Sequence, residues 1–251
     1  MSPSNLGRVL VVIPTYNERE NLPLIVAGVR TAAPEVYILV ADDNSPDGTG
    51  EVADGLAASD QSVQVLHRAN KAGLGAAYLE AFQWAKDKNF DVVVEMDADG
   101  SHSPTDLVKI LAALTDSDVV LGSRWVKGGR VVNWPKSREM LSRGGNIYTR
   151  LWLGIPLRDA TGGFRAYRMS ALNKMDLAKV ESQGYCFQVD MAWRTVRCGL
   201  RLTEVPITFL EREIGESKMN QAIVKEALWR VTQWGLAKRS ADLKRLAKLG
   251  R

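Results

Sequence analysis

Five short apolar runs, separated by segments with helical periodicity, fill the first half of the chain and constrain its fold more than any other feature. The runs are Arg8–Pro14, Val36–Ala41, Val63–His67, Val92–Met96 and Val119–Gly122. Such nearly continuous apolar runs are typical of strands covered on both faces. Helices are expected over residues 18–32, capped by Asn17, and over 47–58 and 73–87, and Ser103-Pro104 opens a fourth. The alternation predicts an α/β fold with a doubly wound, mostly parallel sheet.

The second half of the chain is less regular and shows no clean domain boundary. Helical patterns cover residues 137–153, 185–198 and 221–249, and short strands are expected within 164–168 and 201–210. The last helix contains Gly235, a candidate break because glycine is a poor helix former. We therefore expect one domain over residues 1–235 and a basic amphipathic tail over 236–251.

Composition excludes several classes of protein. The chain has 251 residues, of which 45% are hydrophobic and 25% charged, unlike a disordered or fibrous chain. Two cysteines cannot form a disulfide framework, and two histidines leave too few ligands for a polyhistidine zinc site. No apolar stretch reaches the roughly 18–20 residues of a membrane span, and no signal peptide is visible, so an intracellular protein is expected.

Basic and aromatic residues gather in the second half. The segment from Trp125 to Arg158 contains seven Lys or Arg residues and a single acid. The segment from Lys238 to Arg251 contains six Lys or Arg residues and a single acid. Six of the seven tryptophans lie at or after position 125. This pattern indicates an anionic partner met at an apolar surface. A solvated basic face with core tryptophans is the alternative.

Polar residues follow the first two strands, where ligands bind in sheets of this kind. Pro14-Thr-Tyr-Asn-Glu18 lacks the glycine fingerprint of a dinucleotide-binding turn, which argues against hydride transfer. Asp42 and Asp43 end the second run, and Asp43 is a candidate acceptor for ribose or base groups. The turn chemistry of residues 44–48 is the alternative.

Asp97 and Asp99 follow the fourth run and, as residues i and i+2 of an extended segment, project the same way. Two carboxylates at a sheet edge suit a hard divalent cation, Mg or Mn, with water and ligand phosphates completing the shell. A pair of turn acids ahead of the helix at Ser103 is the alternative. His102 lies beside the pair and is not assigned as a ligand.

Cationic groups follow at several other points. The segment from Lys71 to Gly75 starts a helix whose N-terminus favours an anion. Arg124 follows the fifth run, Arg138 and Ser142 lie one helical turn apart, and the segment Arg212–Lys218 adds a cationic loop. Guanidinium groups match phosphate oxygens, although surface charges and an ordinary polar loop would look similar.

Together these motifs resemble glycosyltransferase family 2 and, within it, the dolichol-phosphate mannosyltransferases, above all the catalytic domains of actinobacterial polyprenol monophosphomannose synthases. The resemblance covers about residues 8–235. In chain order its motifs are Pro14–Glu18, Asp42–Thr49, Lys71–Gly75, Met96–Asp99, Gly122–Arg124, Thr161–Arg165, Gly184–Gln188, Glu204–Phe209 and Arg212–Lys218. An ordered set of this size is highly specific.

The resemblance implies a GT-A fold, GDP-mannose as donor, a polyprenyl (dolichyl-type) monophosphate as acceptor and inversion to a β-mannosyl product. The implied donor-binding residues are Pro14, Tyr16, Glu18, Asp43, Lys71, Gly73, Gly75, Asp97, Ala98, Asp99, Arg212 and Lys218. The acceptor phosphate would contact Arg124, Arg138 and Ser142. The metal, Mg or Mn, would be held by Asp97, Asp99 and Ser101, the last standing where relatives often carry Gln. The groups implied in catalysis are Asp99, Arg124, Arg138, Arg212 and Lys218.

Catalysis of this kind needs no strong base. A phosphate monoester has a second pKa of about 6 and is largely ionised at pH 7. We therefore expect catalysis to rest on positioning of the acceptor and on charge stabilisation of the leaving GDP. Asp159 and Asp190 are candidates for orienting groups, and neither is assigned as a base.

The resemblance also bears on location and partners. Relatives of one branch carry C-terminal membrane helices, and this sequence shows none. Some actinobacterial relatives are fused to, or anchored by, a multispanning membrane protein. We therefore expect a cytoplasmic enzyme on the inner face of the cell membrane, with Trp229, Trp234 and the tail 236–251 near the surface, a membrane anchor protein as a possible partner and no nucleic acid. The alternatives are another donor such as UDP-glucose, a non-lipid acceptor, a nucleotidyltransferase, or a non-catalytic sugar-nucleotide-binding subunit.

Overall fold

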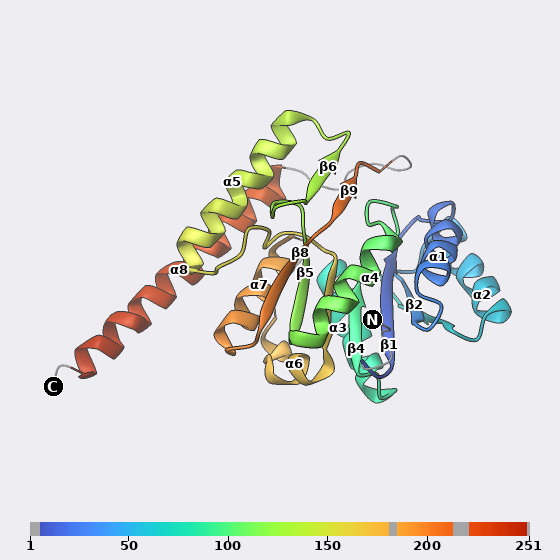
Figure 1. Cartoon of the computed structure of the whole chain (residues 1–251), viewed down its shortest axis with the longest axis horizontal. Coiled ribbons are helices and arrows are strands. Elements are labelled where there is room, and N and C mark those ends of the chain that lie inside the picture. The colour runs from blue at the N-terminus through green and yellow to red at the C-terminus, as the bar shows by residue number, and fades with distance from the viewer. Residues whose placement is uncertain (1–5, 181–184, 213–220, 250–251) are drawn as a thin grey trace.

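A seven-stranded sheet runs through the molecule, and helices cover both of its faces (Figure 1). The computed structural model describes residues 6–180, 185–212 and 221–249, with side chains of the last helix given over 224–240. The strands of this sheet are β1 (Val9–Thr15), β2 (Tyr37–Asp42), β3 (Val63–His67), β4 (Val92–Glu95), β5 (Val119–Ser123), β7 (Arg165–Arg168) and β8 (Leu202–Pro206). Two short strands, β6 (Arg130–Val132) and β9 (Thr208–Leu210), pair in parallel beside it.

The order of the strands is β3-β2-β1-β4-β7-β5-β8. β1 pairs in parallel with β2 and β4, and β5 pairs in parallel with β8. β7 is inserted antiparallel between β4 and β5, with Ala166 opposite both Val94 and Val120. The predicted doubly wound, mostly parallel α/β sheet is therefore confirmed, with one reversed strand whose position was not predicted.

The helices form a layer on each face of the sheet. In chain order they are α1 (Asn21–Ala32), α2 (Thr49–Ser59), α3 (Leu74–Asp87), α4 (Pro104–Ala113), α5 (Lys136–Leu153), α6 (Met169–Lys174), α7 (Tyr185–Arg197) and α8 (Gln221–Leu249). Alternate residues of β1 enter two separate cores: Val11 packs with α1, α2 and α4, and Val12 packs with α3, α6 and α7. Because both faces are covered, the strands need apolar residues at every position.

The starts of helices α1 and α4 were predicted with different success. Helix α1 begins at Asn21, so the expected cap at Asn17 is wrong. Asn17 has a left-handed backbone (φ 60°) and lies in a turn in which the N–H of Leu22 donates to the carbonyl of Glu18 at 2.8 Å. Helix α4 does begin at Pro104, as predicted.

Helices α5 and α8 lie side by side, and α8 continues past the end of α5 (Figure 1). The break considered at Gly235 is wrong, because α8 is continuous through it. A β-carbon at Gly235 would stand 2.9 Å from the carbonyl oxygen of Trp152 on α5, so glycine permits the two helices to approach closely. Nζ of Lys238 donates to the carbonyl of Leu153 (2.8 Å) and thereby caps the C-terminus of α5. None of the helices in the described ranges is both long and apolar enough to cross a membrane.

Candidate active site

The strands β1, β2, β4 and β5 run in the same direction, so the residues that follow them gather at one edge of the sheet. Asp43 follows β2, Asp97 and Asp99 follow β4, and Arg124 follows β5. Arg212, which comes shortly after β9, reaches the same edge and pairs with Asp99. This edge is the candidate active site.

Asp99 is buried among partners that favour its charged form. Its Oδ2 lies 2.9 Å from Nη2 of Arg212, and its Oδ1 accepts a hydrogen bond from the backbone N–H of Ser101 at 3.1 Å. Burial opposes ionisation, but the interactions with Ser101, Arg212 and His102 outweigh it and hold the pKa of Asp99 below its ordinary value. Asp97 is more open, with 34% of its side chain exposed.

His102 is buried behind the acid pair. Its Nδ1 accepts a hydrogen bond from the backbone N–H of Asp97 (3.0 Å), and its ring stacks on Phe164 with the centroids 4.8 Å apart. Phe209 meets the same ring edge-on, with the centroids 5.5 Å apart. His102 therefore supports the backbone of the acid pair.

The oxygen atoms around Asp97 and Asp99 fit a hard divalent cation. Both acids line one cavity, and the buried Ser101 hydroxyl has no hydrogen-bond partner among the described residues. Over residues 6–180, 185–212 and 221–249, no three His, Cys, Asp or Glu side chains come close enough together to hold a metal. The described part of the chain would thus supply two carboxylates and leave the other positions to water or phosphate oxygens, an arrangement common for Mg²⁺.

Residues around the ends of β1 and β2 form the side on which the donor nucleoside was expected. Nζ of Lys71 lies 3.6 Å from the ring centroid of Tyr16, so the structure brings these two together. Glu18 is fixed by its backbone N–H, which donates to Oγ1 of Thr49 at 3.0 Å, and by its Oε2, which accepts from Nδ2 of Asn21 at 2.9 Å. The aromatic ring, the cation and the carboxylate thus have defined positions.

Asp43 is engaged by a residue that the sequence motifs did not indicate. Arg68 follows β3, ion-pairs with Asp43, and donates from Nε to Oε2 of Glu80 at 2.8 Å. Burial raises the pKa of Asp43 above its ordinary value although Arg68 opposes this shift. Arg68 comes one residue after an apolar run, and this position was the sequence signal that could have identified it as a site residue.

The remaining predicted donor residues are backbone or small-residue positions. Pro14 lies in β1 opposite Ala41 of β2. Gly73 has φ 90° and precedes α3, and Gly75 is buried in the first turn of that helix. Ala98 is buried between the two acids. Lys218 lies outside the described residues.

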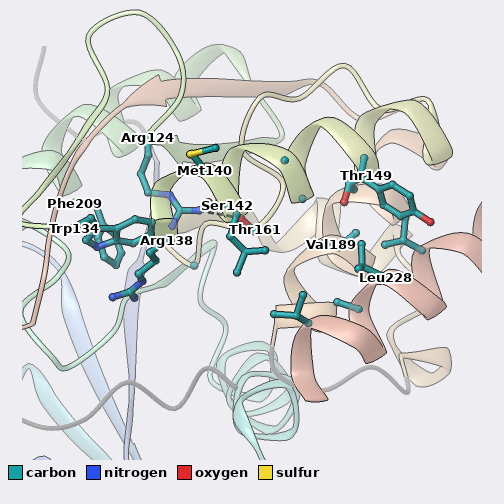
Figure 2. Close-up of a pocket in the computed structure, with 18 of the residues that line it drawn as sticks. Arg124, Trp134, Arg138, Met140, Ser142, Thr149, Thr161, Val189, Phe209 and Leu228 are labelled. Carbon is teal, nitrogen blue, oxygen red and sulfur yellow. Dashed lines mark hydrogen bonds between the residues drawn. The ribbon is translucent and has the colours of Figure 1, made fainter. Parts of the chain in front are cut away.

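Arg138 and Ser142 lie one turn apart on α5 and line the same cavity as Asp97 and Arg124 (Figure 2). Nη1 of Arg138 pairs with the carboxylate of Glu211, and its guanidinium lies 4.2 Å from the ring centroid of Trp134. The structure thus brings the predicted acceptor residues together and shows Arg138 with an acidic partner.

Arg124 is paired with Asp159, which was a candidate for orienting groups but had no predicted partner. Nε and Nη2 of Arg124 each lie 2.7 Å from one carboxylate oxygen of Asp159, a bidentate arrangement. Asp159 is fully buried, and although burial favours its neutral form, the charge and hydrogen bonds of Arg124 lower its pKa. Nothing in the spacing of these two residues connected them.

One cavity of about 480 Å³ joins these groups. Its polar end is lined by Asp97, Asp99, Arg124, Arg138 and Arg212. The rest is lined mainly by apolar side chains of α5, α7 and α8, among them Met140, Leu141, Val189, Val224, Leu228 and Val231. The cavity therefore offers charge at one end and an apolar wall along the other.

Arg165 and Glu95 form part of the core behind this edge. Arg165 is completely buried in β7 and donates to the carbonyls of Ala160, Gly162 and Gln188 at 2.6–2.7 Å. Burial raises the pKa of Glu95 to about 7, although Arg165 and the amide of Gln188 oppose this shift. A charged side chain in a central strand gives no sequence signal that it is buried.

Comparison with known proteins places this chain in a family. The family described as glycosyl transferase family 2 matches residues 10–176. An undecaprenyl-phosphate mannosyltransferase from Micrococcus luteus is 56% identical over 243 residues, covering 97% of this chain and 99% of the relative. A polyprenol monophosphomannose synthase from Mycolicibacterium smegmatis is 54% identical over 231 residues, covering 91% of this chain and 87% of the relative.

Solved structures with the same fold are more distant in sequence. Glucosyl-3-phosphoglycerate synthase from Mycobacterium tuberculosis aligns with a TM-score of 0.65 over 94% of this chain and 81% of its own, at 17% identity. A mannosyltransferase from Pyrobaculum calidifontis, solved with GDP-Man and Mn²⁺, aligns with a TM-score of 0.58 over 100% of this chain and 78% of its own, at 16% identity. At this identity they show the fold alone, and that fold is the predicted GT-A type. The family match and the two relatives that share more than half of its residues establish that the chain belongs to glycosyltransferase family 2.

Proposed function

We propose that the protein transfers mannose from GDP-mannose to a polyprenyl monophosphate, with inversion at the anomeric carbon, to give a polyprenyl-phosphate β-mannose. The observation that carries this proposal is the two-part cavity, in which Arg124 and Arg138 lie at one end and apolar side chains of α5 and α8 line the rest (Figure 2). A polyprenyl phosphate has the same two parts, an anionic head and an apolar tail. The names of the two relatives, a mannosyltransferase and a phosphomannose synthase, support the sugar and the acceptor.

Asp97 and Asp99 would hold Mg or Mn, and Ser101 is close enough in sequence to assist. When bound, the cation would neutralise charge on the diphosphate of the leaving GDP. Arg212 already lies 2.9 Å from Asp99, so its guanidinium is placed to share the charge of a diphosphate held there. The complex of GDP-Man and Mn²⁺ with the Pyrobaculum calidifontis mannosyltransferase is consistent with this assignment.

The nucleoside would lie over the ends of β1 and β2. The contact of Lys71 with Tyr16 offers an aromatic face and a cation, and Glu18 and Asp43 offer carboxylates to sugar hydroxyls or to a base edge. The backbone ahead of α3, at Gly73, is placed to approach the ligand closely because glycine adds no side chain there.

The acceptor phosphate would bind Arg138, Ser142 and Arg124. One of its oxygens, already ionised at neutral pH, attacks the anomeric carbon of mannose, the bond from that carbon to the GDP oxygen breaks, and the electron pair leaves with GDP. No proton has to be removed, so the chain's task is to align the two substrates and to stabilise charge. In the structure Glu211 forms an ion pair with Arg138. A phosphate dianion bound to Arg138 would replace the Glu211 carboxylate.

We further propose that α5 and α8 contact the cytoplasmic surface of the membrane. Several large apolar side chains of these helices are exposed, led by Met140 (74%), Leu151 (69%) and Trp229 (64%). Keeping the lipid tail in the bilayer requires the enzyme to come to the surface, since each exposed CH₂ costs about 0.8 kcal/mol. The basic residues of 236–251 would add attraction to anionic lipids. A separate membrane anchor protein stays a prediction.

The proposal is tested by incubating the purified chain with radiolabelled GDP-mannose, Mg²⁺ and a polyprenyl phosphate, and then extracting with organic solvent. We expect label in the organic phase that depends on the acceptor and on the metal, and none from UDP-glucose. The Asp99→Asn variant serves as the matched control for the metal site. Transfer from UDP-glucose, or label that stays in water with every acceptor, would refute the assignment.

A further inference from the structure

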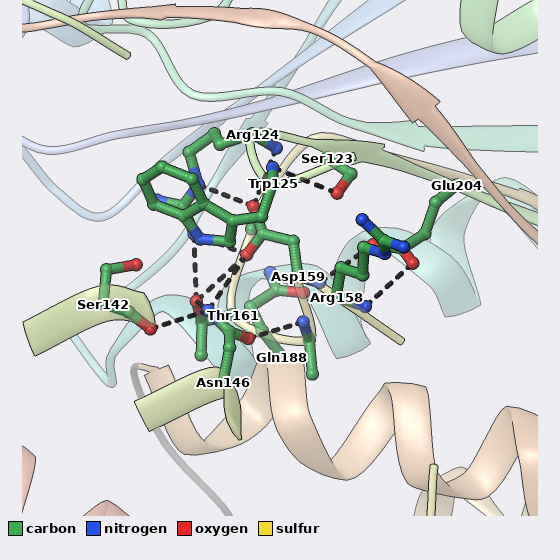
Figure 3. A network of polar contacts seen from close by, with 12 residues as sticks. Ser123, Arg124, Trp125, Ser142, Asn146, Arg158, Asp159, Thr161, Gln188 and Glu204 are labelled. Atoms are coloured by element: carbon green, nitrogen blue, oxygen red, sulfur yellow. Dashed lines mark hydrogen bonds and ion pairs between the residues drawn. The ribbon is translucent and has the colours of Figure 1, made fainter. Parts of the chain in front are cut away.

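A buried polar network lies behind the cationic end of the cavity and ties four parts of the chain together (Figure 3). Its members are Arg124 after β5, Asn146 on α5, Asp159 and Thr161 in the segment before β7, and Glu204 on β8. Arg124, Asn146 and Asp159 are 5%, 4% and 0% exposed. None of the roles proposed above uses Asn146, Asp159, Thr161 or Glu204.

Asp159 holds Arg124 from two directions. Its Oδ2 accepts from the backbone N–H of Arg124 at 2.9 Å and from Nε at 2.7 Å, and its Oδ1 accepts from Nη2 at 2.7 Å. The hydroxyl of Thr161 donates to Oδ1 as well, at 3.2 Å. A carboxylate has about four lone-pair sites, and these donors fill them. The side chain is therefore committed to fixing the guanidinium and has no surface on which to meet a substrate.

Asn146 links α5 to the same segment. Its Nδ2 donates to Oγ1 of Thr161 at 3.1 Å and to the carbonyl of Ser142 at 2.9 Å, and its Oδ1 accepts from the backbone N–H of Ala160 at 2.8 Å. Every polar atom of this amide thus has a partner in the protein. The helix that carries Arg138 and Ser142 is tied by these bonds to the residues that hold Arg124.

Glu204 anchors the segment to the sheet. Its two carboxylate oxygens accept from the backbone N–H groups of Arg158 and Asp159, each at 2.8 Å. Glu204 lies in β8 directly opposite Leu121 of β5, the strand that leads to Arg124. The position of Asp159 is therefore set from the same strand pair that sets the position of Arg124.

We infer that Asp159 and Asn146 are positioning residues for the acceptor phosphate: Asp159 orients Arg124, and Asn146 fixes α5, with Arg138 and Ser142, against it. This inference rests on the proposed function. The three phosphate-binding side chains come from two separate elements, and a nucleophile aligned by both depends on their relative placement. The donor side, at Tyr16 and Lys71, belongs to other elements and should be insensitive to the network.

The test compares substitutions that each change a single member of the network. Asn146→Ala and Thr161→Val each delete the hydrogen bond between these two side chains, and Thr161→Ser keeps the hydroxyl. The matched control is Asn173→Ala, at an exposed position of α6. For each protein we would measure the acceptor KM with a short-chain polyprenyl phosphate, the KM for GDP-mannose, the GDP Kd and the melting temperature.

We expect Asn146→Ala and Thr161→Val each to lower acceptor kcat/KM by about tenfold or more, because each removes several hydrogen bonds of the buried network. In these two variants the GDP-mannose KM and the GDP Kd should stay near the wild-type values. Thr161→Ser and Asn173→Ala should match the wild type in all the measured quantities. Because the two losses share a bond, the double variant Asn146→Ala/Thr161→Val should lose less than the product of the single effects.

Several outcomes would decide against the inference. Equal losses on the donor and acceptor sides, or multiplicative effects in the double variant, would show that the network has only a general structural role. Asp159→Asn should lower acceptor kcat/KM and leave the GDP Kd near wild type, and equal losses on both sides would assign Asp159 a general structural role. A wild-type chain that makes no lipid-linked mannose would overturn the proposed function itself and this inference with it.

Discussion

Gly235 gives the sharpest test of how α8 packs on α5, because the same substitution should have opposite effects at two glycines. Replacing glycine by alanine inside a helix normally stabilises a protein by about 0.5–1 kcal/mol, since alanine loses less conformational entropy on folding. Gly55 in α2 is such a position, because it is exposed and an added β-carbon would have nothing within 4 Å of it. We therefore expect Gly55→Ala to stabilise the chain by about 0.5–1 kcal/mol.

At Gly235 the added carbon would stand 2.8 Å from Cε3 of Trp152 and 2.9 Å from the carbonyl oxygen of the same residue. Carbon atoms in contact are normally about 3.5–4.0 Å apart, so the two helices would have to separate by roughly 1 Å. The carbonyl belongs to the backbone of α5 and cannot rotate away. Overpacking of this kind costs about 1–3 kcal/mol and exceeds the gain in helix propensity. The net effect should be a destabilisation of about 0.5–2 kcal/mol.

Urea or thermal unfolding of the two variants beside wild type measures both effects. For a chain of this size 1 kcal/mol corresponds to about 2–4 °C in Tm, so the two variants should move in opposite directions by readily measured amounts. The Gly235→Ala variant should also lose acceptor activity, because α8 carries part of the cavity wall, including Leu228 and Val231. If Gly235→Ala raises the melting temperature as much as Gly55→Ala does, α5 and α8 do not approach each other closely at Gly235.

Four other experiments probe the site, the packing and the surface. Asp99→Ala should lower transfer by about 100-fold or more, and EDTA should inhibit the wild type until Mg or Mn is restored; near-normal turnover of the variant would contradict the metal assignment. Arg138→Ala should raise the acceptor KM more than the GDP Kd, whereas equal losses would assign this arginine to the donor. Burial raises the pKa of the Cys186 thiol to about 12, so only the exposed Cys198 should react quickly with a thiol reagent in the native protein at pH 8, and a second fast thiol would count against the packing of α7. Removing residues 241–251, which leaves the cap on α5 intact, should weaken salt-sensitive binding to anionic liposomes, and unchanged sedimentation would show that the tail is not the membrane contact.

The sheet was largely predictable because parallel strands covered on both faces leave a continuous apolar run in the sequence. All five runs became β1 to β5, and the helices between them were placed within a few residues. The insertion of β7 was not predictable, since antiparallel pairing with two distant strands has no local signal. Arg165 made the position of β7 harder to predict, because an arginine in a short strand suggests an exposed strand at the edge of a sheet. In the structure three backbone carbonyls satisfy its guanidinium in the core.

The roles of single residues at helix ends and helix contacts were also hard to predict from the sequence. Sequence spacing cannot separate a glycine that ends a helix from a glycine that lets another helix approach. Gly235 was interpreted as a candidate break and is instead a contact point, which only the position of Trp152 on α5 reveals. Asn17 is the converse case, where a good capping residue adopts a left-handed backbone and the helix begins at Asn21.

In the candidate site, the sequence identified the arginines but not their pairing with acids: Asp99 was expected as a metal ligand, Asp159 only as an orienting group, and Glu211 had no assigned role. Arg124 meets Asp159, Arg138 meets Glu211 and Arg212 meets Asp99, each across at least 35 positions of the chain. The pairs explain how three guanidinium groups converge on one cavity without strong repulsion. They also differ in kind. Asp159 is fully buried and all its hydrogen-bonding positions are filled, so its ion pair with Arg124 should be stable. The side chains of Glu211 and Arg138 are 25% and 17% exposed, so a phosphate could displace Glu211 from Arg138. Substrate anions would therefore enter by replacing the exposed acid, while the buried one keeps Arg124 in place.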